Sequence, residues 1–530
     1  MSQVYLIIFV ALWSLSVLYR SLSYVYIWQV KEYRADRMRS FLRTGPGKQF
    51  FFDKFRALKL GLLILGLAAI YYLDWYYLLP ILVYFLELGF IIKKRRLQKP
   101  DFTSKALLIL ALMLIFLIPN SILILLASPS LNLKILYLIG LDLLLPVISL
   151  FSILIQWPLS YVLKARTFKR AAAKRAAFPD LKVIGITGSY GKSSTKEFLA
   201  TILSAKFKVL KTPKNVNSEM GIANFLLKNL STDYEVLVVE MGAYKKGEIK
   251  KSCQIAKPQI GILTAVSQQH LDLFGSIENT KQAKYELISA LPDSGFAVFN
   301  GDNKYTFELA LKTRTPHAIY SVKDKADIWA TEIQTSFDKI RFKLNGKELS
   351  EHLEARVFGK HNVSNLLAAI EVALHLGLDI QEIKQGLSKI EPLEKTLKVF
   401  TGIKEIKVID DSYSANPDGV IAALDYLESF EYKQKIVLMP SLIELGRESA
   451  EIHGNLGKEL ARVATKVIIT TADHYKDLIA ELKTEDAEKF TLITKAKDII
   501  AALDPILHKS TVVLIESRIP KSVIKYLTLN

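Results

Sequence analysis

Hydrophobic positions follow two different patterns along the 530 residues of this chain. As far as residue 163, apolar residues form nearly continuous runs of roughly 17 to 25 residues, the length that a helix needs to cross a bilayer. We expect five membrane spans, over residues 4–27, 58–73, 75–92, 106–127 and 135–163, with a tight hairpin at Asp74 between the second and the third. From residue 181 on, short apolar runs alternate with amphipathic segments, which predicts doubly wound α/β domains.

Basic residues are concentrated in the apolar third of the chain. The first 180 residues hold 23 Lys and Arg against 8 Asp and Glu, a net +15, whereas the whole chain carries +18. Most of them lie in the connections 31–59 and 93–105 and in the segment 164–175, and the opposite loops hold only Lys134. By the positive-inside rule, the N-terminus lies outside the cytoplasmic membrane and everything after residue 163 lies in the cytoplasm. The charge therefore favours membrane lipid as a partner, and nucleic acid is not expected.

Three charged residues lie inside the predicted spans, namely Arg20, Glu87 and Asp142. Charges at membrane depth are costly, so such residues either contact a substrate or pair with one another inside the bundle. The sequence alone leaves both interpretations open.

Composition excludes two kinds of protein. Half of the residues are hydrophobic and the mean hydropathy is +0.23, which excludes an intrinsically disordered chain. The single cysteine, Cys253, excludes an intramolecular disulfide framework and a multi-cysteine metal site. We expect an α-helical transmembrane bundle over residues 1–175, an α/β P-loop ATPase domain over 176–395 and a Rossmann-like α/β domain over 396–530.

A glycine-rich loop follows the first predicted strand, residues 181–187, and precedes a helical pattern. In this arrangement backbone N–H groups face phosphates, a lysine reaches the β and γ oxygens, and a hydroxyl binds Mg²⁺. The strict Walker spacing fails because Ile186 stands where its first glycine is needed, so an ordinary glycine turn is the alternative. The pattern predicts that ATP is bound by Thr187, Gly188, Ser189, Gly191, Lys192, Ser193 and Ser194.

Together with this loop, seven further stretches resemble the Mur ligase superfamily, and within it the branch of UDP-N-acetylmuramoyl-tripeptide:D-alanyl-D-alanine ligases. They occur in family order and extend over roughly residues 181 to 530. The stretches are Asn215–Gly221, Val239–Ala243, Gln269–Gly275, Ala283–Glu286, Gly359–Asn365, Asp410–Pro417 and Glu444–Gly446.

The resemblance implies an ATP-dependent amide ligase, which turns a carboxylate into an acyl phosphate and lets an amine attack it, forming ADP and phosphate. It implies two Mg²⁺ ions, one held by Ser193 and Glu240 and the other by His270 and a carbamylated Lys284. Lys281, on the same predicted helix, is the competing candidate for the carbamate. Lys192, His270 and Lys284 are the implied catalytic residues.

The remaining motifs imply contacts to nucleotide and substrate. The nucleotide contacts would come from His361, Asn362, Asn365 and Asp411. The substrate contacts would come from Asn215, Asn217, Ser218, Tyr413 and Asn416. His453 also has a counterpart in the family, although a surface position on a helix would explain it too.

The chain departs from the family pattern in several places. Ser414 stands where an asparagine is usual, Lys395 or Thr396 where an arginine is expected, and Pro440-Ser441 where the family has Gly-Asp. The predicted membrane spans occupy the place of the family's UDP-binding domain. A UDP-linked and a lipid-linked peptide therefore both remain as the acceptor.

Three hypotheses follow. The first is a membrane-anchored ligase of cell-wall peptide synthesis that adds D-Ala-D-Ala to a small-molecule or lipid-linked peptide. The second is a poly-γ-glutamate-type ligase, and the third is a membrane-tethered ATP-binding scaffold without turnover. The loop after Asn215 and the motif at Asp410 favour the first over the second, and the joint presence of Glu240, His270 and Lys284 weighs against the third.

Overall fold

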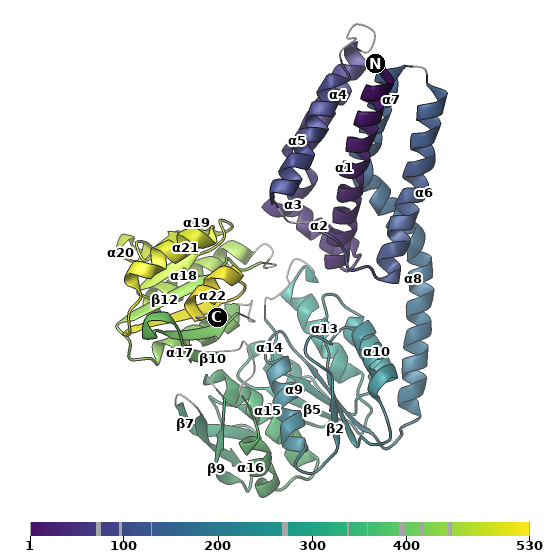
Figure 1. Ribbon diagram of the computed structural model, residues 1–530. Helices are drawn as coiled ribbons and strands as arrows, with labels where there is room; N and C mark the ends of the chain where they lie inside the picture. The colour runs from purple at the N-terminus through teal and green to yellow at the C-terminus, as the bar shows by residue number, and fades with distance from the viewer. Residues whose placement is uncertain are drawn as a thin grey trace. The chain divides into compact units, whose positions relative to one another are not determined.

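The computed structural model (Figure 1) forms two compact units, Met1–Ala165 and Arg166–Asn530. It describes residues 2–69, 76–94, 98–128, 130–267, 274–335, 339–357, 359–391, 398–412, 417–443, 445 and 448–528. Several predicted positions lie outside the described residues: Asp74, His270, Lys395, Thr396, Tyr413, Ser414 and Asn416.

The first unit is a helical bundle. Its described helices are α1 (Ser2–Val30), α2 (Ala35–Arg43), α3 (Gly45–Phe51), α4 (Lys54–Ala69), α5 (Leu78–Lys94), α6 (Ser104–Ala127), α7 (Leu131–Leu143) and α8 (Leu145–Ala176), the last of which continues into the second unit.

Three helical stretches among the described residues are long and apolar enough to cross a membrane, over 3–30, 104–127 and 145–176. The helices α4 and α5 are shorter, with 16 and 17 residues. The span predicted over 135–163 is divided between α7 and α8, which are separated at Leu144. Length and composition thus single out three candidate spans, where the hydrophobic pattern predicts five.

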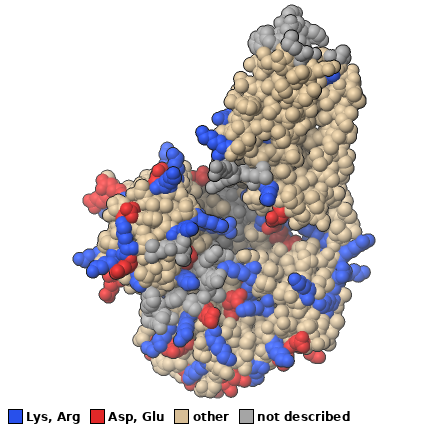
Figure 2. All heavy atoms as spheres, in the orientation of Figure 1, with Lys and Arg blue, Asp and Glu red and all other residues tan. Residues whose placement is uncertain are grey.

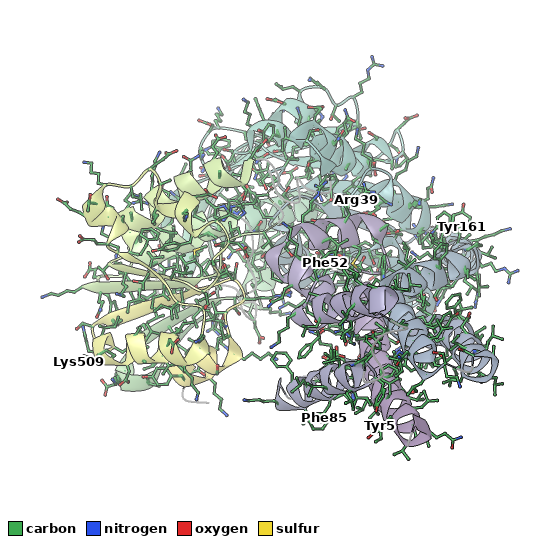
Figure 3. All side chains as sticks on the ribbon, turned by 90° about the horizontal axis from the view of Figure 1, so that it is seen from above. Tyr5, Arg39, Phe52, Phe85, Tyr161 and Lys509 are labelled. Atoms are coloured by element: carbon green, nitrogen blue, oxygen red, sulfur yellow. The ribbon has the colours of Figure 1, made fainter. Side chains whose placement is uncertain are left out.

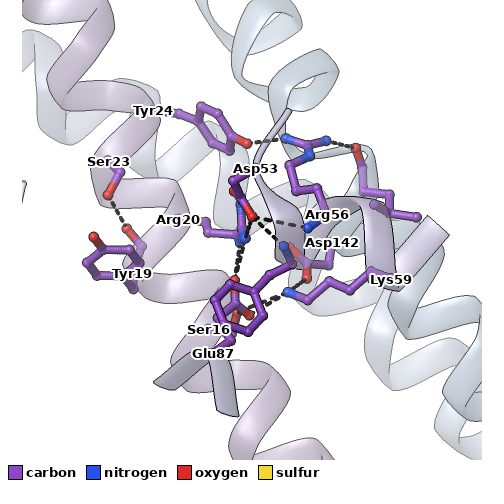
Figure 4. Close-up of polar contacts among 12 residues, drawn as sticks. Ser16, Tyr19, Arg20, Ser23, Tyr24, Asp53, Arg56, Lys59, Glu87 and Asp142 are labelled. Atoms are coloured by element: carbon purple, nitrogen blue, oxygen red, sulfur yellow. Dashed lines mark hydrogen bonds and ion pairs between the residues drawn. The ribbon is translucent and has the colours of Figure 1, made fainter. Parts of the chain in front are cut away.

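The charged residues inside this bundle pair with one another (Figure 4). Glu87 of α5 accepts hydrogen bonds from Arg20 Nε of α1 at 2.8 Å and from Lys59 Nζ of α4 at 2.6 Å. Lys59 also contacts Asp142 of α7, which accepts the hydroxyl of Tyr84 at 2.7 Å. All five side chains are buried. Of the two interpretations of the intramembrane charges, the structure therefore shows pairing within the bundle.

Large apolar side chains cover the outside of the same bundle. Phe85 and Tyr161, which are 63% and 67% exposed, lie on its periphery (Figure 3). The face visible in Figure 2 is almost entirely uncharged, whereas the second unit carries side chains of both signs. Ion pairs buried within an apolar core, under a surface that is itself apolar, differ from the pattern in a water-soluble domain, where charged side chains lie mostly on the surface.

The N-terminal part of the second unit is built on a sheet with strand order β2-β3-β1-β4-β5-β6-β7-β8-β9 in the described residues. Strands β1 to β7 are parallel, and β8 and β9 are added antiparallel. The strands are β1 (Lys182–Thr187), β2 (Val209–Lys211), β3 (Val236–Glu240), β4 (Ile260–Leu263), β5 (Phe296–Asn300), β6 (His317–Ser321), β7 (Ile328–Thr335), β8 (Ile340–Gly346) and β9 (Ser350–Ala355).

Helices cover both faces of this sheet because strand residues alternate between two apolar cores. Ile184 and Val238 pack with α9 (Lys192–Leu203), α15 (His361–His375) and α16 (Ile380–Ser388). Val183 and Val239 pack on the other face with α10 (Glu219–Asn229), α11 (Glu248–Ala256) and α13 (Ile277–Ser289). The short helix α14 (Lys304–Ala310) follows β5. The prediction of a doubly wound domain is confirmed for this part.

The C-terminal part has a second sheet, of order β10-β11-β15-β12-β13-β14 in the described residues. It is parallel except for the edge strand β10, which runs antiparallel to β11. Its strands are β10 (Lys398–Thr401), β11 (Lys407–Asp411), β12 (Gln434–Met439), β13 (Lys466–Ile469), β14 (Phe490–Leu492) and β15 (Thr511–Glu516). Its α-helices are α17 (Pro417–Glu428), α18 (Ser449–Val463), α19 (Tyr475–Ile479), α20 (Thr484–Ala487), α21 (Ala496–Leu503) and α22 (Lys521–Thr528).

Candidate functional site

The predicted phosphate loop connects the end of β1 to the start of α9, and its two glycines are required by geometry. Gly188 has φ +152°, and a Cβ there would come within 2.1 Å of Thr264 Oγ1. Gly191 has φ +79°, and a Cβ there would come within 2.5 Å of Asn365 Oδ1. Because L side chains rarely adopt such φ values, only glycine fits this turn without strain. The loop ends at the N-terminus of α9, which favours an anion.

Lys192, the first residue of α9, folds back over this loop. Its Nζ donates hydrogen bonds to the carbonyl oxygens of Gly188 at 2.8 Å and Ser189 at 3.0 Å. Burial lowers the pKa of Lys192, and the nearby Glu240 carboxylate opposes that effect. The amine therefore lies at the loop where a phosphate would be bound.

Glu240, at the end of β3, is buried and hydrogen-bonded at both of its oxygens. Its Oε2 accepts the hydroxyl of Ser193 at 2.9 Å, and its Oε1 accepts the side-chain amide of Asn217 at 3.1 Å. A hydroxyl and a carboxylate are the hard oxygen ligands that Mg²⁺ prefers, and Mg²⁺ usually takes its other ligands from water and phosphate. This pair fits the first predicted Mg²⁺. No group of three or more His, Cys, Asp or Glu side chains able to hold a metal lies within the described residues.

Lys284 and Lys281 of α13 lie in opposite surroundings. Lys284 is 4% exposed, and its pKa is lowered to about 7 by burial and then by the positive charge of Lys192. Lys281 instead forms ion pairs with Glu278 at 3.2 Å and Glu308 at 3.0 Å, and its pKa is raised. Carbamylation requires a neutral amine, so the structure favours Lys284 over Lys281 for it.

One cavity of about 90 Å³ brings several of the predicted residues together. It extends from the phosphate loop to Lys284 and includes Tyr244, a residue that the sequence did not single out. The lining residues are Gly188, Ser189, Lys192, Asn217, Gly242, Ala243, Tyr244, Phe274 and Lys284.

The three residues predicted to contact substrate in the loop after β2 have different roles in the structure. Asn217 holds Glu240, and its carbonyl accepts the N–H of Gly242 at 2.8 Å. Ser218 is the N-cap of α10, because its hydroxyl accepts the N–H of Gly221 at 3.2 Å. Asn215 has φ +66°, a left-handed conformation that asparagine tolerates better than most residues. Of the three, only Asn217 lines the cavity.

The predicted nucleotide residues of α15 lie at its first turns. Asn365 is buried, its Nδ2 donates to Asn362 Oδ1 at 2.9 Å, and its Oδ1 accepts from Thr195 Oγ1 at 3.4 Å. The contact with Thr195 ties α15 to the helix that follows the phosphate loop, α9. His361 is exposed at the start of α15.

Asp411, predicted to contact nucleotide, is buried at the end of β11. It is the register partner of Glu516 at the end of β15, so the two carboxyl groups lie on neighbouring strands. Burial and the Asp411 charge raise the pKa of Glu516 well above its ordinary value. Nothing in the sequence marked Glu516, because the pairing of β11 with β15 joins residues about a hundred positions apart.

His453 lies inside the C-terminal part, so the alternative of a surface position is wrong. Its Nε2 accepts the backbone N–H of Leu442 at 3.1 Å, which leaves Nδ1 to donate to the carbonyl of Ser449 at 2.6 Å. Burial lowers the pKa of His453 and keeps this neutral form. The imidazole thereby connects Leu442 to Ser449, and Glu444 and Gly446 lie outside the described residues.

Two family models match this chain: the Mur ligase middle domain over residues 186–373 and the Mur ligase glutamate ligase domain over residues 397–518. The UDP-N-acetylmuramoyl-tripeptide–D-alanyl-D-alanine ligase of Mycobacterium tuberculosis is 32% identical over 313 residues, which are 57% of this chain and 61% of that protein. The Escherichia coli enzyme of the same name is 29% identical over 324 residues, 60% of this chain and 71% of that protein. The chain thus spans about 61% of the length of the mycobacterial relatives.

Solved structures agree. MurF from Acinetobacter baumannii superposes with a TM-score of 0.62 at 27% identity, covering 67% of this chain and 78% of that one. MurF ligase from Thermotoga maritima in complex with ADP gives 0.59 at 25% identity, covering 68% and 83%. With both family domains present in order and together covering more than half of its length, the chain belongs to the Mur ligase family.

Proposed function

We propose that this protein is an ATP-dependent amide ligase of peptidoglycan synthesis, which joins D-alanyl-D-alanine to the carboxylate of a cell-wall peptide. The observation that carries the proposal is the cavity that is lined by both Lys192, the lysine of the phosphate loop, and Lys284, whose amine has a lowered pKa. The relatives named for this reaction support the choice of amine.

The proposed reaction has two steps. A carboxylate oxygen of the peptide attacks the γ-phosphorus of ATP, the bond to the bridging oxygen breaks, and ADP leaves. The amine nitrogen then attacks the carbonyl carbon of the acyl phosphate, phosphate leaves, and the nitrogen loses a proton. Approach of two anions is the main barrier to the first step, so the loop N–H groups and Lys192 contribute by holding the phosphates and screening their charge.

Ser193 and Glu240 would hold one Mg²⁺, which when bound neutralises phosphate charge. The hydrogen bond between them at 2.9 Å keeps both oxygens at one place beside the loop, and Asn217 fixes the other carboxylate oxygen. For Lys284 we propose carbamylation: the neutral amine bonds to the carbon of CO₂ and a proton leaves to solvent. The product is an anion, which together with His270 would suit a second Mg²⁺.

We propose that the first unit spans the cytoplasmic membrane five times. The ion pairs of Arg20, Lys59, Glu87 and Asp142 are buried, while apolar side chains of α4 and α5 as well as α1, α6 and α8 are exposed. Paired charges lower the cost of placing the short helices α4 and α5 in lipid. With five spans, the N-terminus is outside and the second unit is cytoplasmic.

A phosphate-release assay tests the ligase proposal. The full-length protein in detergent is given Mg-ATP with D-Ala-D-Ala or L-Glu as the amine, and with UDP-linked or lipid-linked peptide as the carboxylate. We expect release that requires both D-Ala-D-Ala and a peptide. Release should be greater with the lipid-linked peptide, because both family matches begin after residue 185 and the proposed membrane spans occupy the part of the chain before them. Release with L-Glu alone would support the poly-γ-glutamate type, and ATP binding without release for any pair would support the scaffold.

Single-cysteine labelling tests the topology. The only cysteine, Cys253, is buried, so a Cys253→Ser chain offers a clean background. We expect a cysteine at Asp74, between the second and third predicted spans, to react with an impermeant maleimide on intact cells and one at Lys99 to react only after lysis. Reaction of both from the same side would contradict the five-span arrangement.

A further inference from the structure

A second lysine lies buried next to the proposed metal-binding pair, Ser193 and Glu240. Lys196 is one helical turn after Lys192 on α9 and has no exposed surface. Its Nζ lies 3.6 Å from Glu240 Oε2, the same oxygen that accepts the Ser193 hydroxyl. It also lies 3.2 Å from Glu197 Oε1. Lysines are almost never fully buried unless they are paired, so this amine is held in place by the two carboxylates.

The ion pairs form a chain that leads from the protein surface to the metal-binding pair. Lys211, which is exposed, pairs with Glu197, then Glu197 with Lys196, and Lys196 with Glu240. Glu197 is thus shared between two lysines, whereas the side chain of Glu240 contacts one lysine, Lys196, together with the neutral groups of Ser193 and Asn217 among the described residues. Among the described residues, Lys196 is therefore the lysine at ion-pair distance from the Glu240 carboxylate, and Lys192 is near enough to add a second positive charge.

We propose that Lys196 is a positioning residue that takes the place of a metal charge at Glu240 until nucleotide arrives. It holds the carboxylate oriented toward Ser193, and its positive charge disfavours a bare divalent cation on the same oxygen. The phosphates of ATP add the negative charge needed to bring the cation in. The site would accordingly bind Mg²⁺ as the nucleotide complex and not the free ion. This inference rests on the proposed function only in taking Ser193 and Glu240 as Mg²⁺ ligands.

The test measures binding of Mn²⁺, a paramagnetic substitute for Mg²⁺, to the full-length protein in detergent by electron paramagnetic resonance, first without nucleotide and then with ADP. In Lys196→Met, nucleotide-free Mn²⁺ binding is expected to tighten by about tenfold or more, since a positive charge 3.6 Å from the Glu240 oxygen that would hold the ion is removed. Lys196→Arg is expected to bind Mn²⁺ as the unchanged chain does. The double variant Lys196→Met/Glu240→Gln is expected to lose the gain.

Lys211→Met is the matched control, because it removes a lysine from the same chain of ion pairs without touching Glu240. Thermal unfolding checks that each variant is folded, and Lys196→Gln replaces Lys196→Met if the latter is not. Unchanged nucleotide-free binding in the folded neutral variants, or an equal gain in Lys211→Met, would overturn the proposal. The readout needs no turnover. If Lys196→Met binds Mn²⁺ more tightly and the unchanged protein shows no ligase activity, the proposed function is overturned and the inference about Lys196 stands.

Discussion

Lys281 and Lys284 show that the surroundings of a lysine decide whether its amine is easily deprotonated. They are three positions apart on one helix, yet one is paired with two exposed glutamates and the other is buried without a described carboxylate bonded to its amine. Burial disfavours the charged form of an amine and so makes Lys284 the nucleophilic one.

We expect Lys284→Ala to lower ligase activity by at least about 10- to 100-fold, the range seen when the support of a metal site is removed. A short-chain carboxylate such as acetate should restore part of it by supplying the missing anion. Lys281→Ala, measured in the same assay, should keep most of the activity. Full activity in Lys284→Ala would contradict the carbamate.

The buried pair of Asp411 and Glu516 predicts a pH dependence of stability. The pKa of Glu516 is raised in the folded protein, so above about pH 4.5 the folded state retains a proton that the unfolded state has lost. Stability should therefore fall with rising pH, by up to about 1.4 kcal/mol per pH unit, until Glu516 itself ionises.

Glu516→Gln removes this proton-binding group and keeps the shape of the side chain. Its melting temperature should exceed that of the unchanged protein at pH 8, with a difference that shrinks toward pH 5. The exposed Glu485→Gln should show no such trend. A difference independent of pH would argue against a raised pKa of Glu516.

At the scale of elements, α15 packs against the predicted phosphate loop, where Asn365 lies next to Gly191. Gly191 and Gly377 have nearly the same φ, +79° and +80°, but only Gly191 has a neighbour within 4 Å of its missing Cβ. Alanine at either position costs roughly 1 to 2 kcal/mol of backbone strain.

We therefore expect Gly191→Ala to abolish ATP binding, because its Cβ would displace Asn365 and the loop with it. Gly377→Ala should lose a similar amount of stability and still bind ATP. Isothermal titration with a non-hydrolysable ATP analogue distinguishes the two. Equal affinities would show that the contact with α15 is not needed.

The stability of the helical bundle depends on its buried ion pairs. Lys59→Met would leave Glu87 and Asp142 without their shared cation, a loss of about 3 to 5 kcal/mol for a broken buried pair. Thermal unfolding in detergent should show a large decrease for Lys59→Met and little change for the exposed Lys99→Met. Equal melting temperatures would indicate that the ion pairs are not formed.

At the scale of the whole molecule, the described part of the candidate site lies entirely in the second unit, since its residues extend from Thr187 to Glu516. A chain beginning at Arg166 should therefore stay in solution and bind ATP about as well as the full-length protein. We expect it to lose turnover with a lipid-linked peptide first. Co-sedimentation with membranes and ATP-analogue titration measure the two properties, and loss of ATP binding would show that the first unit supports the site.

Local features of the sequence were sufficient to predict the general fold and the glycine loop between β1 and α9. Hydrophobic period distinguishes membrane helices from strands, and the order of glycines, Lys192 and Ser193 after a strand defines a phosphate loop, because both depend only on neighbouring residues. The number of spans does not follow from neighbouring residues alone, since α4 and α5 are short and carry charges whose partners are distant in sequence.

Tertiary structure decided whatever depends on residues that meet from far apart. The low pKa of Lys284 comes from burial in a folded cavity. Glu87 pairs with cations inside the bundle because three helices meet there. Asp411 is paired with Glu516 because the strand order places β11 beside β15. Lys196 is the sharpest case. In the sequence it is an ordinary helical lysine, and only the placement of β3 beside α9 makes it the counter-ion of Glu240, because an ion pair needs two charges within a few ångströms whatever their separation along the chain.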